Sequence, residues 1–124
     1  MTIAYICILI LLFITYGTVM IAKWDKNYDN AQPRAWIDKQ EGVKRRAYYA
    51  HQNGLEAIPI FAAAVIIAHQ MHAQQSTIDS LAIIFIITRV LYTLCYLYDK
   101  AALRSLMWFS GLVCTIAIFF SGTF

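Results

Sequence analysis

The chain has 124 residues, of which 60% are apolar and only 14% charged, and its formal net charge is +3. A soluble domain carries about a quarter charged residues, so this composition excludes an ordinary soluble enzyme. The length allows one domain, 1–124. No basic face of a soluble domain can form from so few charges, which argues against a nucleic-acid partner.

Four apolar segments each reach the roughly 20 residues that a helix needs to cross a bilayer. They are expected at 2–22, 47–71, 76–98 and 101–121, with a polar loop at 23–46. Helices satisfy their own backbone hydrogen bonds in lipid. The expected fold class is therefore all-α, a transmembrane four-helix bundle. Ser76 and Asp79 have the spacing of a capping box, which predicts the start of the third span.

The basic residues predict the orientation of the bundle in the membrane. Seven of the ten lie in the loop 23–46: Lys23, Lys26, Arg34, Lys39, Lys44, Arg45 and Arg46. Lys100 and Arg104 flank the turn between the third and fourth spans, whereas the turn 69–77 has no Lys or Arg. The positive-inside rule places the loop and the third–fourth turn in the cytoplasm. Both termini are then expected outside.

Polar residues inside the spans are the candidates for a functional site, because ionisable groups are costly in lipid. Asn53 and Glu56 share one face of the second span, and Arg89, Tyr92 and Tyr96 form one stripe on the third. The helical rise puts Glu56 and Arg89 at similar depth. We expect these two to form an ion pair, directly or through water.

Arg46 and Arg104 add guanidinium groups near the cytoplasmic ends of their spans. Together with the polar residues of the second and third spans, they would line a polar pocket that opens to the cytoplasm. Two other interpretations stay open. The Glu56–Arg89 pair could be a structural staple without a ligand, and Tyr92 and Tyr96 could be interfacial aromatics. No metal site is predicted, since two nearby histidines are too few ligands.

The second span resembles the corresponding helix of the MAPEG family, the membrane-associated proteins in eicosanoid and glutathione metabolism. The family pattern is Arg, then Ala-x-x-Asn-x-x-Glu, then Pro, and it is matched here by Arg46, Ala50, Asn53, Glu56 and Pro59. The third span is similar through Arg89, Tyr92 and Tyr96, and Leu103-Arg104 opens the fourth. The resemblance covers essentially the whole chain and points to a short, bacterial-type member.

The resemblance implies a homotrimer in the bacterial inner membrane, with glutathione, as substrate or cofactor, bound between subunits near the cytoplasmic face. The positions that correspond to glutathione contacts are Asn53, Glu56, Tyr92, Tyr96 and Arg104, with Arg46 at the mouth. Arg104 takes the catalytic position, where an arginine lowers the thiol pKa. Tyr49 departs from the family, because catalytic eicosanoid members carry a second arginine there. The role of His51 is open.

The leading hypothesis is a glutathione-dependent transferase or peroxidase that acts on lipophilic electrophiles arriving from membrane lipid. The alternative is a non-catalytic membrane protein of the same fold, which either binds lipid or serves as an accessory subunit of a larger membrane complex. Tyr49 favours this alternative, because it replaces an arginine that would bind a carboxylate. Glutathione binding separates the two hypotheses.

Overall fold

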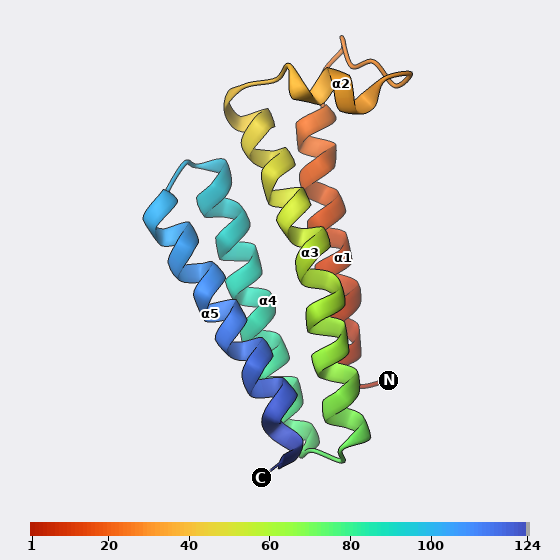
Figure 1. The fold of residues 1–124 in the computed structure, drawn as a ribbon, viewed down its shortest axis with the longest axis vertical. Coiled ribbons are helices and arrows are strands. Elements are labelled where there is room, and N and C mark those ends of the chain that lie inside the picture. Colours follow the sequence, from red (N-terminus) through yellow and green to blue (C-terminus); the bar gives the residue numbers. More distant parts are fainter. Residues whose placement is uncertain (124) are drawn as a thin grey trace.

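The computed structural model describes residues 1–123. It contains four long helices, α1 (Ile3–Lys23), α3 (Gly42–Gln70), α4 (Gln75–Leu97) and α5 (Ala101–Phe120), together with the short α2 (Pro33–Asp38) and a final 3-10 turn at Ser121–Thr123 (Figure 1). All four long helices are long and apolar enough to cross a membrane, which confirms the all-helical fold with four candidate spans. No strand occurs in residues 1–123.

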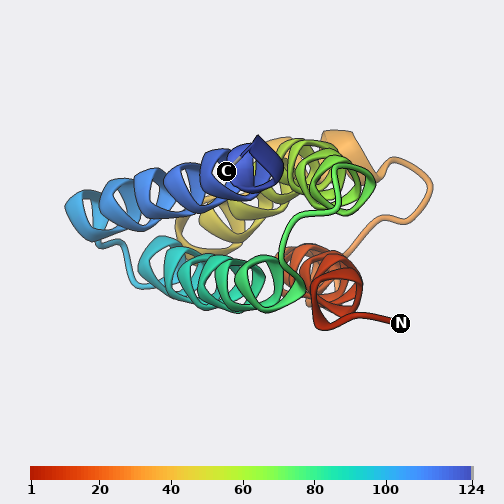
Figure 2. The ribbon, with the colours of Figure 1, turned by 90° about the horizontal axis from the view of Figure 1, so that it is seen from below.

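The long helices alternate in direction and pack as two antiparallel pairs, α1 with α3 and α4 with α5. Seen along the bundle, α1 lies beside α4 and α3 lies beside α5 (Figure 2). Both termini and the α3–α4 turn lie at one end of the bundle. The segment that carries α2 and the α4–α5 turn lie at the opposite end, called here the loop end.

The helices differ from the expected spans mainly at the loop end. α3 begins at Gly42 and not at residue 47, and the expected loop 23–46 contains α2. Hydropathy finds only the apolar part of a helix, whereas backbone hydrogen bonding carries α3 outward beyond it. Arg45 and Arg46 therefore sit on the first turns of α3. Pro33 opens α2 at the first helical position, where its missing N–H costs no hydrogen bond.

The apolar core occupies the half of the bundle nearer the termini. The largest fully buried side chains include Leu11, Phe61 and Ile78, and Phe61 stacks on Phe85 with ring centroids 4.0 Å apart. Large apolar side chains also cover the outside of the helices, as expected where lipid replaces water. The buried polar residues of α3 and α4 gather in the other half, toward the loop end.

α1 and α3 pack closely at Gly54. A Cβ atom at this position would lie 2.5 Å from Thr15 Oγ1 and 2.7 Å from Thr15 Cγ2. One turn away, His51 Nδ1 donates to the Thr15 carbonyl at 2.8 Å. Glycine removes the side chain that would separate the helices, and the histidine then ties them together.

One prediction about the end that carries the termini is wrong. The capping box predicted at Ser76 and Asp79 does not form, because α4 begins at Gln75 and its N-cap Gln74 makes no side-chain capping bond. Asp79 Oδ1 instead accepts from the backbone N of Ala4 at 2.8 Å. This N–H belongs to the first turn of α1, where no backbone partner exists within the helix. The carboxylate therefore caps a neighbouring helix and not its own.

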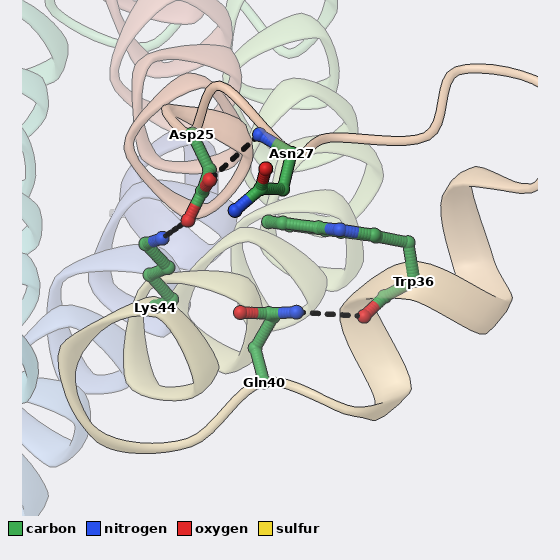
Figure 3. A network of polar contacts seen from close by, with 5 residues as sticks. All are labelled: Asp25, Asn27, Trp36, Gln40 and Lys44. Carbon is green, nitrogen blue, oxygen red and sulfur yellow. Dashed lines mark hydrogen bonds and ion pairs between the residues drawn. The ribbon is translucent and has the colours of Figure 1, made fainter.

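A polar network fastens the loop to the start of α3 (Figure 3). Asp25 forms an ion pair with Lys44 and accepts from the backbone N of Asn27 at 2.8 Å. The Lys44 ammonium lies 5.6 Å from the centre of the Trp36 ring, and Gln40 Nε2 donates to the Trp36 carbonyl at 3.1 Å. The hydrogen bond from Lys44, together with that from Asn27, lowers the pKa of Asp25 from its ordinary value.

The close approach at Gly54 predicts that Gly54→Ala destabilises the bundle. The new methyl group would overlap Thr15, whose Oγ1 is itself bound to the Leu11 carbonyl at 2.8 Å and cannot move freely. Overpacking of this kind costs about 1–3 kcal/mol. A lower midpoint of thermal unfolding in detergent is the expected result.

Gly17→Ala is the matched control, because a Cβ there meets nothing within 4 Å. Its unfolding midpoint should not fall. Adding Thr15→Ala to Gly54→Ala should recover part of the loss, since it removes the two nearest atoms. Equal midpoints for Gly54→Ala and the parent protein would contradict the packing described here.

The Asp25–Lys44 contact predicts a pH-dependent loop. Because the folded-state pKa of Asp25 is lowered, the contact contributes fully above the ordinary value of 3.8 and is lost as the pH falls through the lower folded value. Trp36 fluorescence, in a variant with Trp24 and Trp108 replaced by Phe, should therefore change in this acidic range. Asp25→Asn should abolish the transition, and a transition that survives it would refute the assignment.

Candidate functional site

A cavity of about 140 Å³ lies between α3, α4 and α5. Three polar side chains singled out from the sequence line it: Asn53 and Glu56 from α3 and Arg89 from α4. The remaining walls are Ala57, Ile60, Phe85, Trp108, Gly111, Leu112 and Thr115. The packing of α4 on α5 brings Gly111 so close to α4 that a Cβ there would lie 3.0 Å from Thr88 Oγ1.

Arg89 is the most deeply buried charged residue of the cavity, with 4% of its surface exposed. Its Nη2 donates to Asn53 Oδ1 at 3.0 Å, and Asn53 Nδ2 lies 3.4 Å from Glu56 Oε2. No ion pair joins Glu56 to Arg89 within the described part of the chain. The contact expected between the two charges therefore runs through the Asn53 carboxamide, which accepts from one and donates to the other. Glu56 itself is exposed.

Two tyrosines and a second arginine continue from Arg89 along α4 to the start of α5. The Arg89 guanidinium lies 4.2 Å from the Tyr92 ring centre. Tyr92 meets Tyr96 edge to face with centroids 5.6 Å apart, and the Arg104 guanidinium lies 4.4 Å from the Tyr96 ring centre. We call these four residues the arginine–tyrosine ladder. It runs from the buried cavity to the loop end and places a cation at each end.

Arg46 lies apart from Asn53 and Glu56, on the first turns of α3. Its Nη2 donates to the carbonyl of Leu97 at the end of α4, at 3.2 Å. This position suits a cation, because the last carbonyls of a helix lack partners and carry partial negative charge. Arg46 therefore links α3 to α4 at the mouth of the polar region. Its Nε is buried and, like Arg89 Nε, has no hydrogen-bond partner among residues 1–123.

Tyr49 stands at the loop end beside the ladder. Its hydroxyl accepts from Arg45 Nη1 at 3.3 Å, and its ring centre lies 6.5 Å from that of Tyr96. Arg45 also bonds the carbonyls of Asp38 and Gln40. Although the second arginine of the pattern is absent at position 49, a guanidinium still reaches this place from one turn earlier.

Sequence reasoning placed Arg104 at the site but missed the cavity wall that the middle of α5 supplies. Trp108 lines the cavity together with Gly111 and Thr115. Their spacing of three and four residues puts them on one helix face, and this spacing was the available signal. His51 has a structural role in the bond to Thr15. That role could not be predicted, since its acceptor is a backbone carbonyl.

An apolar groove of about 450 Å³ adjoins the polar cavity along α3 and α5. The two share Ile60, Leu112 and Thr115. Pro59 lines the groove from within α3. A ligand with a polar end and an apolar body would fit here, with its polar end in the cavity and its apolar body in the groove.

Comparison with known proteins agrees with the architecture. The model of the MAPEG family matches residues 1–124, the whole chain. No curated protein and no solved structure matches it. The match confirms the resemblance seen in the second and third spans. The chain, with its four candidate spans and its arginine–tyrosine ladder, belongs to the MAPEG family.

Proposed function

We propose that the protein is a membrane-bound glutathione-dependent transferase or peroxidase that acts on lipophilic electrophiles. The observation that carries this proposal is the arginine–tyrosine ladder beside Asn53 and Glu56. It brings cations, hydrogen-bond donors and one exposed carboxylate to the same half of the bundle. Glutathione, with two carboxylates and one ammonium, needs this combination of partners.

The donor set fits such a ligand. The exposed Glu56 carboxylate would take the ammonium, and Arg46 and Arg104 would take carboxylates, for which guanidinium groups are suited. The partnerless Nε atoms of Arg46 and Arg89 are buried donors that an anionic ligand or its bound water would satisfy. Arg89 is already held by Asn53 and Tyr92, so it acts as a positioning residue.

The cavity is too small to hold the whole ligand. Its 140 Å³ falls below the roughly 300–1,000 Å³ of usual small-molecule sites. The tripeptide would therefore extend past the exposed Glu56, beyond the surface of one subunit. A second copy of the chain would cover it there. A homotrimer is proposed on this ground and on the family membership.

Arg104 is the proposed catalytic residue. It is partly buried at the start of α5, and no carboxylate pairs with it among residues 1–123. A guanidinium beside a thiol favours the thiolate, which is the nucleophilic form. Tyr96, on whose ring Arg104 rests, would donate a hydrogen bond to the thiolate or to the peptide. The apolar groove beside the cavity would admit the electrophile from the membrane.

Arg104→Ala tests the assigned chemistry. It should lower the rate of conjugation of glutathione to an apolar aryl halide by about a hundredfold, as loss of one charge-stabilising donor does. Binding of glutathione should weaken much less. Lys39→Ala, which removes an exposed cation in the loop, is the control and should keep the parent rate. An unchanged rate in Arg104→Ala would remove the residue from the mechanism.

The alternative, a non-catalytic lipid-binding or accessory protein, rests on the Arg89–Asn53–Glu56 contacts. These contacts lie within one subunit and could serve as a structural staple alone. Calorimetry with millimolar glutathione on the purified protein distinguishes the two. Saturable binding that Glu56→Gln weakens supports the enzyme. Absence of binding in the parent protein favours the accessory role.

The loop end is proposed to face the cytoplasm of the bacterial inner membrane, with both termini outside. Both termini lie at the opposite end of the bundle, so the side of the membrane that the loop end faces also fixes the side of the termini. Lys39→Cys, in intact cells, should resist a membrane-impermeant maleimide until the membrane is opened. Labelling before that step would show the opposite orientation.

The proposed homotrimer is tested separately. In detergent, light scattering should give the mass of three protomers, and a monomer would contradict the proposed assembly.

A further inference from the structure

A second cavity, of about 440 Å³, lies between α1, α2 and α3 at the loop end. It shares no residue with the polar cavity or the apolar groove. Its walls are Val19, Lys23, Pro33, Arg34, Ile37, Tyr48, His51, Gln52 and Leu55. The proposed reaction assigns no role to any of these residues.

The charged residues that line this cavity are all positive. Lys23 and Arg34 line the cavity, and no carboxylate does. Neither cation has an ion-pair partner within residues 1–123, and the Lys23 ammonium lies 5.4 Å from the centre of the Tyr28 ring, a contact that leaves its charge uncompensated. The loop cations on α3 are engaged otherwise, since Lys44 pairs with Asp25 and Arg45 binds two carbonyls. Two cations without an acid favour an anion and disfavour any group with a fixed positive charge.

Three further lining residues are polar without a fixed charge: Tyr48, His51 and Gln52. His51 is buried and is held by its bond to the Thr15 carbonyl of α1. The Gln52 amide and the Tyr48 hydroxyl lie on the same walls and can donate hydrogen bonds. A ligand with acceptor oxygens inward of its anionic group would satisfy them.

The position in the bundle points to a membrane amphiphile. Lys23 ends α1, and Thr15, which His51 contacts, lies eight residues or about 12 Å deeper along the helix. Val19 lies between these two levels and Leu55 follows Gly54, which meets Thr15. Both line the cavity with apolar side chains, and Leu55 is exposed on the outer surface. The cavity thus passes from the polar end of the span to the lipid-facing side of the bundle.

We propose that this cavity is a binding site for an anionic phospholipid. Lys23 and Arg34 hold its phosphate, the Gln52 amide and the Tyr48 hydroxyl meet its ester oxygens, and an acyl chain lies against Val19 and Leu55. A headgroup with an ammonium finds no carboxylate here, so phosphatidylglycerol is preferred over phosphatidylethanolamine. The site is independent of the proposed glutathione chemistry.

Native mass spectrometry of the full-length protein tests the site. The protein, purified in detergent, is offered equal amounts of phosphatidylglycerol and phosphatidylethanolamine. The parent should retain phosphatidylglycerol selectively. Lys23→Gln with Arg34→Gln should lower that retention at least about tenfold, because two cation–phosphate attractions are lost. The matched control, Lys26→Gln with Lys39→Gln, removes the same charge from the same loop outside the cavity and should retain the lipid like the parent.

Leu55→Trp provides a second variant should the double substitution fail to fold. It fills the cavity from an exposed position and leaves both cations in place, and it should also release the lipid. Equal loss in the two charge variants would overturn the proposal, as would equal retention of both lipids. Displacement of the bound lipid by inorganic phosphate or millimolar glutathione would also overturn it, since a soluble anion would then be the ligand.

Discussion

A guanidinium inside a membrane-spanning bundle has to find its partners within the protein, because lipid offers none. Arg89 meets this constraint with an amide oxygen from α3 and an aromatic face on its own helix. The choice of a neutral amide matters. Asn53 Oδ1 accepts from one nitrogen of the arginine without neutralising its charge, and Glu56 stays at the surface. The cavity thereby keeps a cation at its base and a carboxylate at its rim, and the two do not cancel.

The fold could largely be predicted from the sequence, since hydropathy along the chain determines which segments can enter lipid. The limits appear where hydropathy carries no signal. The outer turns of α3 up to Gly42 are polar, and α2 is a short helix inside a charged loop. Asp79 shows another limit. Local spacing suggested a cap for its own helix, but the uncapped N–H of Ala4 on a neighbouring helix is the group it meets.

For the candidate site, helical rise and periodicity predicted that Glu56 and Arg89 lie at similar depth, and the structure brings both, with Asn53, to one cavity. Rise and periodicity could not predict which atoms would bond, because depth leaves the rotation of each helix about its axis undetermined. Asn53 therefore lies between Glu56 and Arg89, which were expected to pair directly or through water. The wall supplied by Trp108 and Thr115 also depends on the rotation of α5. The contact of His51 could not be predicted from residue types, because its partner is a backbone carbonyl, which every residue carries.

The pairing of the helices has a consequence for biosynthesis. α1 and α3 form a hairpin that is complete before α4 is made, with its own close contact at Gly54 and its own tie at His51. Helices that are stable separately in the membrane associate afterwards by packing and polar contacts. The first hairpin holds Asn53 and Glu56, whereas Arg89, Tyr92 and Arg104 arrive with the second. Docking of the two hairpins is thus the step that first gives Arg89 its partner on α3, and assembly of the site and completion of the subunit become one event.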